Sequence, residues 1–248
     1  MKTFGLIGKS LQHSFSKQYF LEKFKQNNWK DVNYELFEIQ ELSDLNPLLQ
    51  KNETICGLNV TIPYKESVIP FLDELDETAK MVGAVNCIKI SRSKGVITLK
   101  GYNTDVFGFS SAIKPFLESG HQKALILGTG GASKAVYYVL SKLGIDSYFV
   151  SRTRKQTNTF LYSDLNEFML DSFKLIVNTT PLGMYPNVST CPELPYEYIN
   201  STHFVFDLVY NPEETLLLGK AKQQGALTQN GLSMLRLQAE KGWEIWNA

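Results

Sequence analysis

The stretch Leu125-Ile126-Leu127-Gly128-Thr129-Gly130-Gly131-Ala132-Ser133 decides the fold of this 248-residue chain. An apolar run leads directly into a glycine-rich turn, and residues 135–137 continue with helical period. A strand, a glycine turn and a helix in this order form the unit that binds the pyrophosphate of a dinucleotide. Gly128 would permit the tight turn, and Gly130 would let the backbone approach the phosphates. Ser133 stands at the third glycine position of that pattern, where a small side chain still permits close packing.

Short apolar runs alternate with helix-like segments along the rest of the chain. This alternation predicts an α/β architecture in which crossover helices join parallel strands. Residues 86–90 and 96–100 flank a polar segment, Ser91–Gly95, and are expected to form a hairpin, so the N-terminal sheet should be mixed. The runs expected to form the other strands are Thr3–Ile7, Tyr34–Glu38, Ile55–Val60, Leu125–Leu127, Ser147–Val150, Leu175–Val177, Phe204–Leu208 and Ala226–Thr228.

The length of the chain suits one large domain or two small ones. We expect a domain boundary near Gly101–Asp105, just after the hairpin. Asn103, Thr104 and Asp105 offer N-cap chemistry for a helix that Gly120 would close. The last segment, Leu232–Trp246, reads as an amphipathic helix.

The composition excludes several classes of protein. Lys plus Arg (25) equals Asp plus Glu (25) and the pI is about 6.8, so nucleic acid is not expected as a partner. The three cysteines form no C-x-x-C pair, which indicates a reducing compartment without structural zinc, and no metal is expected. The N-terminal apolar run is too short for a signal peptide, and no stretch reaches the roughly 18 apolar residues of a membrane span. A cytoplasmic protein without a membrane partner is expected.

The strand after the glycine unit indicates which dinucleotide is bound. An NAD site places an acidic residue at the end of that strand, to hold the ribose 2′-hydroxyl. Here residues 147–150 are followed by Ser151-Arg152-Thr153-Arg154-Lys155, and Asp146 lies at the wrong end of the strand. Basic and hydroxyl side chains suit a 2′-phosphate, so NADP is predicted. The alternative is a solvated run of charges.

Polar residues also follow the strands of the first half. Ser14 and Ser16 come after the first strand and suit a carboxylate ligand at a helix start, although capping by Ser16 alone would explain that serine. Lys65 stands at the start of a helix, where the dipole disfavours a cation. Reduction of a carbonyl needs a proton donor, and a lysine ammonium oriented by a carboxylate can act as one. Lys65 and Asp105 are the candidates for this pair.

Eight motifs occur in order along nearly the whole chain. They are Ser14-x-Ser16, Asn59-Val60-Thr61-x-Pro63-x-Lys65, Gly83-Ala84-Val85-Asn86, Gly101-x-Asn103-Thr104-Asp105-x-x-Gly108, Gly128-x-Gly130-Gly131-Ala132, Asn178-Thr179-Thr180-Pro181-x-Gly183-Met184, Asp207-x-Val209-Tyr210-x-Pro212-x-x-Thr215 and Gly231-x-x-Met234-Leu235-x-x-Gln238-Ala239. In these motifs the chain resembles the shikimate dehydrogenase family, and eight together make the resemblance specific.

The resemblance implies an enzyme that reduces 3-dehydroshikimate to shikimate with NADPH, in the route to chorismate and the aromatic amino acids. Lys65 and Asp105 would form its catalytic pair. The residues implied to bind the substrate are Ser14, Ser16, Thr61, Lys65, Asn86, Asp105, Tyr210 and Gln238. Those implied to bind NADP are Gly128, Gly130, Gly131, Ala132, Ser151, Arg152, Thr153, Thr179, Met184, Leu208 and Gly231.

The family fold implies two α/β domains with a cleft between them, in a monomer or a homodimer. Residues 1–102 with 232–248 would form a mixed-sheet substrate domain, and residues 103–231 an NADP-binding, Rossmann-like domain. The chain departs from the family pattern at Cys87, Lys17 and Ser151, which replace Thr, Pro and Asn, and the segment Arg154–Leu170 is short.

Three alternatives remain open from the sequence. A quinate/shikimate dehydrogenase would accept quinate and tolerate NAD; the Ser14/Ser16 pair and Arg152 argue against it. A non-catalytic dinucleotide-binding module, such as a redox sensor, would have a damaged Lys/Asp pair. An α/β scaffold whose polar clusters are only caps and turns would leave Lys65 at an unfavourable helix start without a reason.

Overall fold

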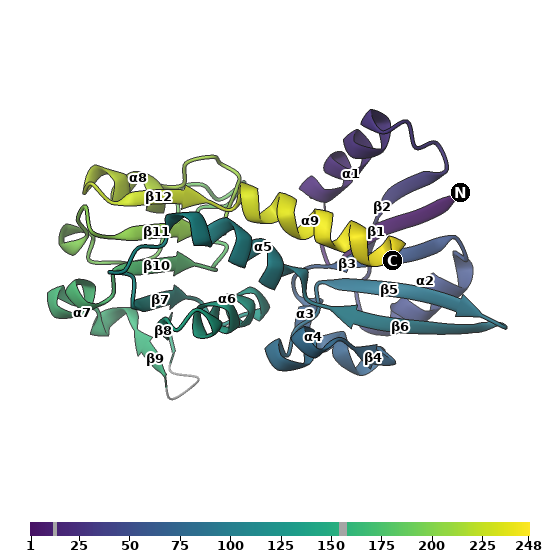
Figure 1. Ribbon diagram of the computed structural model, residues 1–248, viewed down its shortest axis with the longest axis horizontal. Coiled ribbons are helices and arrows are strands. Elements are labelled where there is room, and N and C mark those ends of the chain that lie inside the picture. Colours follow the sequence, from purple (N-terminus) through teal and green to yellow (C-terminus); the bar gives the residue numbers. More distant parts are fainter. Residues whose placement is uncertain (12–13, 154–157) are drawn as a thin grey trace. The chain divides into compact units, whose positions relative to one another are not determined.

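The computed structural model describes residues 1–11, 14–153 and 158–248. The chain divides into two compact units, Met1–Thr104 with Ala239–Ala248 and Asp105–Gln238 (Figure 1). The divisions fall within two helices, α5 (Thr104–Ile113) and α9 (Leu232–Asn247). The sequence places the boundaries at 102/103 and 231/232, and the contacts place them at 104/105 and 238/239. We call the two parts the first unit and the second unit.

The first unit is built on a six-stranded mixed sheet with the order β2-β1-β3-β5-β6-β4. β1 pairs in parallel with β2 and β3, and β5 runs antiparallel to both β3 and β6. The mixed sheet expected for the N-terminal half is therefore confirmed. The strands are β1 (Lys2–Gly8), β2 (Val32–Glu38), β3 (Ile55–Val60), β4 (Glu74–Leu75), β5 (Cys87–Ser93) and β6 (Val96–Tyr102).

The hairpin between β5 and β6 is confirmed, but its turn is shorter than expected. Ser93 pairs with Val96, so only Lys94 and Gly95 lie between the strands. Both turn residues have positive φ, 50° and 81°, which matches the twist of a two-residue hairpin turn. The expected loop over Ser91–Gly95 was therefore wrong, because a glycine at the second turn position lets the strands continue to the tip.

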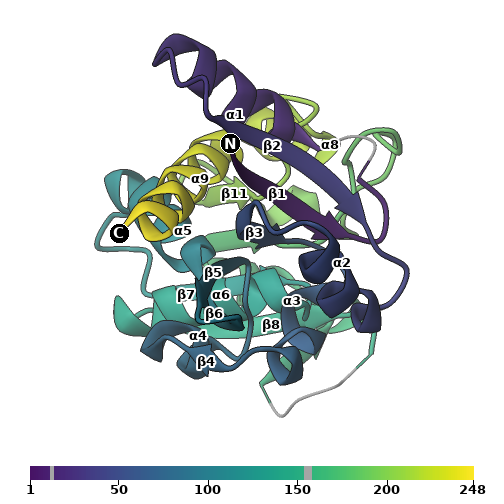
Figure 2. The same ribbon diagram turned by 90° about the vertical axis from the view of Figure 1, so that its right-hand side faces the viewer.

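Helices cover both faces of the first unit's sheet. On one face lie α1 (Phe15–Gln26) and the last part of α9 (Figure 2). They bury an aromatic cluster in which Phe4 lies 5.0 Å, centroid to centroid, from both Trp243 and Trp246. On the other face α2 (Leu45–Lys51), α3 (Tyr64–Ser67) and α4 (Glu77–Val82) contribute to a second apolar cluster. The apolar side chains of α9 thus belong to two cores, because the first part of the helix packs within the second unit and the last part within the first.

The start of α1 differs from the expected one. Ser14, not Ser16, is the N-cap, and its hydroxyl accepts a hydrogen bond from the Ser16 amide at 3.3 Å. The helix begins at Phe15 because Ser14 has an extended backbone, so the expected capping by Ser16 was wrong. Lys17, which stands where the family pattern has proline, forms an ion pair with Glu35 on β2 at 2.7 Å. That ammonium holds the pKa of Glu35 below its usual value.

The second unit has a six-stranded parallel sheet with the order β12-β11-β10-β7-β8-β9. Both the parallel arrangement and the helix after the glycine turn are confirmed. The short strand β9 was not expected, because three residues carry no clear periodicity. The strands are β7 (Lys123–Leu127), β8 (Asp146–Ser151), β9 (Thr159–Leu161), β10 (Leu175–Asn178), β11 (Phe204–Asp207) and β12 (Leu227–Asn230).

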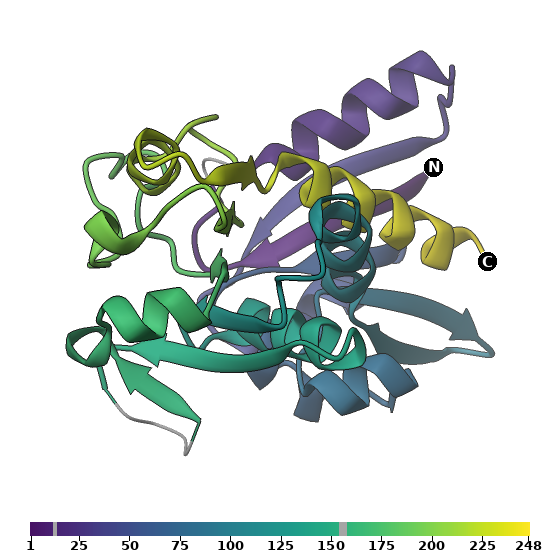
Figure 3. The same cartoon turned by 60° about the vertical axis from the view of Figure 1, so that its left-hand side comes forward.

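Alternating side chains of this sheet feed two apolar clusters. Ala124 and Ile126 pack with α5, α6 (Gly131–Lys142) and the start of α9, whereas Leu125 and Leu127 pack with α7 (Glu167–Ser172) and α8 (Leu216–Gln223). Figure 3 shows this unit from a second direction. With both faces covered, the carboxyl ends of the strands are left to form a polar edge. Short 3₁₀ turns occur at Leu42–Asp44, Ile69–Phe71, Lys114–Phe116, Tyr162–Asp164 and Tyr196–Tyr198.

α5 ends earlier than expected. The helix stops at Ile113 and passes into the turn Lys114–Phe116. Pro115 has no amide hydrogen and its ring clashes with the preceding turn, so the α-helix cannot continue to Gly120. In the ranges 1–11, 14–153 and 158–248, none of the helices has the length and apolar character needed to cross a bilayer.

Candidate active site

The glycine turn at the end of β7 has the geometry that a dinucleotide needs. Gly128 has φ +103°, and a Cβ there would lie 2.9 Å from the Thr179 hydroxyl oxygen. Gly130 is the N-cap of α6, and a Cβ on it would meet no atom within 4 Å. The open space at Gly130 lies beside the N-terminus of α6, which fits a pyrophosphate at a helix N-terminus. The buried Ser133 hydroxyl donates to the Gly130 carbonyl at 2.6 Å, which braces the turn.

The end of β8 presents a cation. Arg152 is exposed directly after the strand, and the Ser151 hydroxyl accepts a hydrogen bond from the Thr153 amide at 3.4 Å. Burial raises the pKa of Tyr162 to about 12, and the charge of Arg152 partly opposes that rise, which places Arg152 near this ring. Asp146 lies at the opposite end of the strand, as expected. The Arg154 and Lys155 of the predicted basic run lie outside the described residues.

The predicted cofactor residues after β10 and β11 lie at the same edge of the sheet. The Thr179 amide and hydroxyl both donate to the Leu127 carbonyl, at 2.9 and 2.6 Å, which joins the β10 exit to the glycine turn. Leu208 and Gly231 touch, since a Cβ on Gly231 would lie 2.1 Å from the Leu208 carbonyl oxygen. Met184 is 41% exposed on the β10 exit loop. The structure thus gathers this predicted set along one edge.

A buried carboxylate lies between these exits. Asp207, the last residue of β11, is fully buried and accepts hydrogen bonds from Asn178, Val209 and Thr215. Burial raises the pKa of Asp207 to about 6, although the three hydrogen bonds act in the opposite direction. Asp207 therefore adds a buried carboxylate, held by three donors, to this edge.

In the first unit the backbone brings together three predicted substrate residues. Lys65 is the second residue of α3, and its carbonyl accepts from the Val85 amide at 2.7 Å. The carbonyl of Asn86 accepts from the Val60 amide at 2.9 Å, and Thr61 follows directly after Val60. Thr61, Lys65 and Asn86 are therefore held at the end of β3 by hydrogen bonds between neighbouring segments.

A buried chain of hydrogen bonds extends this group to Ser16. The hydroxyl of the fully buried Tyr34 donates to Asn59 Oδ1 at 2.8 Å and also hydrogen-bonds the Ser16 side chain. The Asn59 amide then donates to the Asn86 carbonyl at 3.4 Å. Burial raises the pKa of Tyr34 well above its usual value, so the phenol stays protonated and can donate.

The side chain of Asn86 fixes the start of α5. Its Oδ1 accepts from the Thr104 amide at 2.6 Å, and its Nδ2 donates to the Thr104 hydroxyl at 3.0 Å. Asn103 donates from Nδ2 to the Ala84 carbonyl at 2.9 Å. Asp105 follows in the chain and is buried. The Asn103–Asp105 segment thus lies at a helix start, as expected, but hydrogen bonds with Ala84 and Asn86 of another segment hold it there.

The predicted substrate-binding residues are divided between the two units. Ser14, Ser16, Thr61, Lys65 and Asn86 lie in the first unit. The second unit contains the other three predicted substrate residues, Asp105, Tyr210 and Gln238. The pairing of Lys65 with Asp105 stays a prediction.

Sequence reasoning missed several polar residues that hold the site together. Tyr34 and Asn59 lie in strands and Asn178 and Asp207 end strands, where a polar residue has no distinctive spacing. Thr104 and Thr215 lie at helix starts. All of these residues except Tyr34 occur in the family's motifs, which was the available signal, but no hydrogen-bond partner followed from the motif alone. The residues missed are Tyr34, Asn59, Thr104, Asn178, Asp207 and Thr215.

The thiols and acids form no second site in the described part of the chain. Cys56, Cys87 and Cys191 are free thiols. Within residues 1–11, 14–153 and 158–248 there is no group of three or more His, Cys, Asp or Glu side chains that could hold a metal ion.

A parallel sheet with a glycine turn before a helix, and a cation after the next strand, defines a dinucleotide-binding α/β protein. Comparison with known proteins identifies the family. Residues 6–88 match the family model described as the shikimate dehydrogenase substrate binding domain. The shikimate dehydrogenase (NADP(+)) of Methanosphaera stadtmanae is 38% identical over an aligned length of 260 residues, and the alignment covers 98% of this chain and 90% of that relative. The chain belongs to the shikimate dehydrogenase family.

Solved structures agree with this assignment. The Thermus thermophilus shikimate 5-dehydrogenase, crystallised with NADP(H) and shikimate, superimposes with a TM-score of 0.84 at 29% identity, covering 99% of this chain and 93% of that one. The quinate dehydrogenase of Corynebacterium glutamicum, in complex with NAD, also gives a TM-score of 0.84, at 26% identity and with the same coverage. The shared fold therefore includes relatives that differ in substrate and in cofactor.

The raised pKa of Asp207 predicts a pH dependence of stability. Because the folded-state pKa (about 6) exceeds the ordinary value of 3.8, the folded protein holds this proton more tightly than the unfolded chain. The stabilisation is full below about pH 3.8 and is lost as the pH rises to about 6, a change of about 3 kcal/mol. Asp207→Asn, which does not titrate, should therefore gain stability relative to wild type over that range, as urea unfolding at several pH values can measure. A difference that does not change with pH would contradict the assignment.

Proposed function

We propose that this chain catalyses the reversible, NADPH-dependent reduction of 3-dehydroshikimate to shikimate, in the route to chorismate and the aromatic amino acids. The observation that carries the proposal is the 38% identity to an NADP-dependent shikimate dehydrogenase over 98% of the chain. Support comes from the edge of the second unit, where open space at the Gly130 turn fits the pyrophosphate of that cofactor and the exposed Arg152 fits its 2′-phosphate.

We assign the cofactor-binding residues by their place on this edge. The amides of Gly130, Gly131 and Ala132 would bind the pyrophosphate, with Gly128 making the turn. Ser151, Arg152 and Thr153 would hold the 2′-phosphate, because a guanidinium offers two aligned donors. Thr179, Met184, Leu208 and Gly231 would border the nicotinamide. When bound, NADPH supplies the hydride.

The substrate would be held by hydroxyls and amides. Ser14 and Ser16, with help from Tyr210, would bind the carboxylate. The ring hydroxyls would contact Thr61, Asn86, Asp105 and Gln238. In the first unit the buried Tyr34 and Asn59 hold Ser16 and Asn86 in fixed positions, which limits the entropy lost on binding.

Lys65 and Asp105 would manage the proton. Addition of hydride to a carbonyl carbon leaves negative charge on its oxygen, which must be stabilised and protonated. The Lys65 ammonium would hydrogen-bond that oxygen and deliver the proton, and the Asp105 carboxylate would orient the ammonium. An ammonium and a carboxylate that interact titrate as a coupled pair, so the transferred proton belongs to the pair. The reverse reaction returns the proton to the same groups.

A second candidate is oxidation of quinate with NAD, which the likeness to a quinate dehydrogenase favours. The exposed Arg152 at the end of β8 argues against it, because the NAD ribose is usually held there by an acidic residue.

Initial rates with four substrate and cofactor pairs test the proposal. With shikimate and quinate each supplied with NADP or NAD, we expect the highest kcat/KM for shikimate with NADP. A higher value for quinate with NAD would establish the second candidate instead, and no turnover with any pair would refute both.

Arg152→Ala tests the choice of cofactor. Loss of the guanidinium should raise the KM for NADP by about tenfold or more, while the KM for NAD changes little, because only NADP carries the 2′-phosphate. Lys123→Ala is the control, since Lys123 is an exposed cation at the first residue of β7, at the opposite edge of the sheet. Equal changes in both KM values would contradict the assigned role.

Lys65→Ala tests the proton donor. We expect kcat to fall by about 10²-fold or more, the usual contribution of a general acid, while binding of shikimate measured by calorimetry persists. Lys80→Ala, which removes an exposed lysine paired with Glu77 in the same unit, should leave kcat unchanged. Unchanged kcat in Lys65→Ala would remove Lys65 from the mechanism.

A further inference from the structure

The proposed mechanism leaves unused the most deeply buried carboxylate of the second unit, Asp207. Oδ1 of this residue accepts from Asn178 Nδ2 at 2.8 Å and from the Val209 amide at 3.0 Å. Oδ2 accepts from the Thr215 hydroxyl at 2.6 Å. All three donors point at one carboxylate, so these hydrogen bonds favour its ionised form, against the effect of burial.

Each partner of Asp207 fixes a different segment that leaves the sheet. Asn178 ends β10, and its Oδ1 accepts from both the amide and the hydroxyl of Thr180, at 3.0 and 2.7 Å. The Thr180 hydroxyl in turn accepts from the Leu182 amide at 3.3 Å. Thr215 is the N-cap of α8. One carboxylate therefore joins the β10 exit, the β11 exit and the start of α8. We call Asp207 with Asn178, Val209 and Thr215 the junction.

Backbone contacts extend this junction to the residues assigned to the nicotinamide. The Leu208 amide donates to the Asn178 carbonyl at 2.9 Å, and the Gly231 amide donates to the Val209 carbonyl at 3.1 Å. Gly231 lies so close to Leu208 that any side chain at 231 would collide with the Leu208 carbonyl. The positions of Leu208 and Gly231 thus follow from the position of Val209, which Asp207 holds.

The junction lowers the stability of the folded chain at neutral pH. Burial raises the pKa of Asp207, so at neutral pH an ionised group is kept in a place that favours the neutral form. Proteins keep such local conflicts mainly where function needs a defined geometry. A purely structural link between these segments would be served as well by a neutral side chain.

We propose that Asp207, through Asn178 and Thr215, is a positioning residue that sets the two loops against which the nicotinamide end of the dinucleotide binds. The inference rests on the proposed function for the identity of that ligand. It assigns the adenosine end to the glycine turn and to Arg152, neither of which is a hydrogen-bond partner of Asp207. The β10 exit reaches the glycine turn through Thr179, which donates to the backbone carbonyl of Leu127 rather than to the turn's amides. The two ends of the dinucleotide should therefore respond differently when the junction is weakened.

The test compares binding of NADP⁺ with binding of adenosine 2′,5′-bisphosphate, which lacks the nicotinamide end. Thr215→Val keeps the shape of the side chain but removes its hydroxyl, and Asp207→Asn removes the charge. In both variants we expect calorimetry to show an affinity for NADP⁺ reduced by about tenfold, with kcat reduced at least as much, because small displacements of a positioning loop have effects of this size. The affinity for adenosine 2′,5′-bisphosphate should stay within about twofold of wild type. Thr215→Ser retains the hydroxyl and should restore both quantities.

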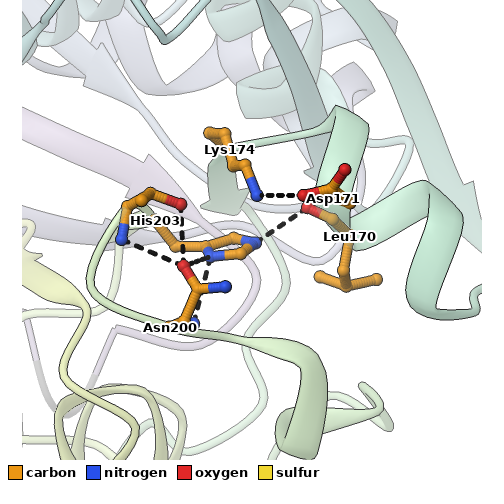
Figure 4. Close-up of polar contacts among 6 residues, drawn as sticks. Leu170, Asp171, Lys174, Asn200 and His203 are labelled. Atoms are coloured by element: carbon orange, nitrogen blue, oxygen red, sulfur yellow. Dashed lines mark hydrogen bonds and ion pairs between the residues drawn. The ribbon is translucent and has the colours of Figure 1, made fainter.

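A matched control comes from the other end of the same strand. His203, immediately before β11, is also buried; its Nε2 donates to the Leu170 carbonyl at 2.9 Å and its Nδ1 accepts from the Asn200 amide at 3.1 Å (Figure 4). His203→Ala should lower the thermal unfolding midpoint but leave kcat and both affinities unchanged below that midpoint. This control separates a loss of stability from a loss of positioning.

Two results would overturn the inference. One is unchanged NADP⁺ affinity and kcat in Thr215→Val and Asp207→Asn; the other is an equal loss of affinity for both ligands. A wild-type chain that binds NADP⁺ but oxidises neither shikimate nor quinate would refute the proposed function alone, since the ratio of the two affinities would still decide the role of Asp207. A wild-type chain with no affinity for NADP⁺ would refute both.

Discussion

The second unit depends on one constraint, that its parallel strands all end at the same edge. Because helices cover both faces of the sheet, the polar groups released at the carboxyl ends of β7, β8, β10 and β11 can only gather there. Gly128, Arg152, Thr179 and Asp207 are far apart in sequence, yet this topology brings them to one edge. The glycine turn contributes through its backbone, since a Cβ on Gly130, the N-cap of α6, would meet no atom within 4 Å.

The first unit differs in that buried hydrogen bonds hold its polar side chains in fixed positions beside an apolar core. The hydrogen bonds from Ser16 through Tyr34 and Asn59 to Asn86 cross the sheet without leaving a buried donor unpaired along that path. Connected hydrogen bonds of this kind are favourable only when every buried polar group has a partner, so they specify one arrangement of the segments they join. The predicted substrate residues would then be positioned before substrate binds, at a cost met during folding.

The sequence predicted the parts of the structure that rest on local patterns. The glycine turn, the parallel strands and the hairpin follow from period, apolar runs and turn residues, and the structure agrees. The errors were also local: Ser14 is the N-cap because α1 begins two residues earlier than capping by Ser16 would place it, and Pro115 ends α5 before Gly120. The junction around Asp207 and the series of hydrogen bonds through Tyr34 could not be predicted. Tertiary packing brings their partners together, and the spacing of these residues in the sequence does not indicate those contacts. The roles of Lys65 and Asp105 came from chemistry and resemblance, and they remain assignments to be tested.

We infer above all that the carboxyl edge of the second unit's sheet binds NADP. Hydrogen–deuterium exchange measured with and without NADP⁺ tests this directly, because amides that bind or adjoin a ligand exchange more slowly. We expect slower exchange at residues 129–133 and 179–184, which begin at the ends of β7 and β10, with no change at residues 121–123 and 200–203 at the opposite edge. Protection confined to that opposite edge, or to the first unit, would contradict it.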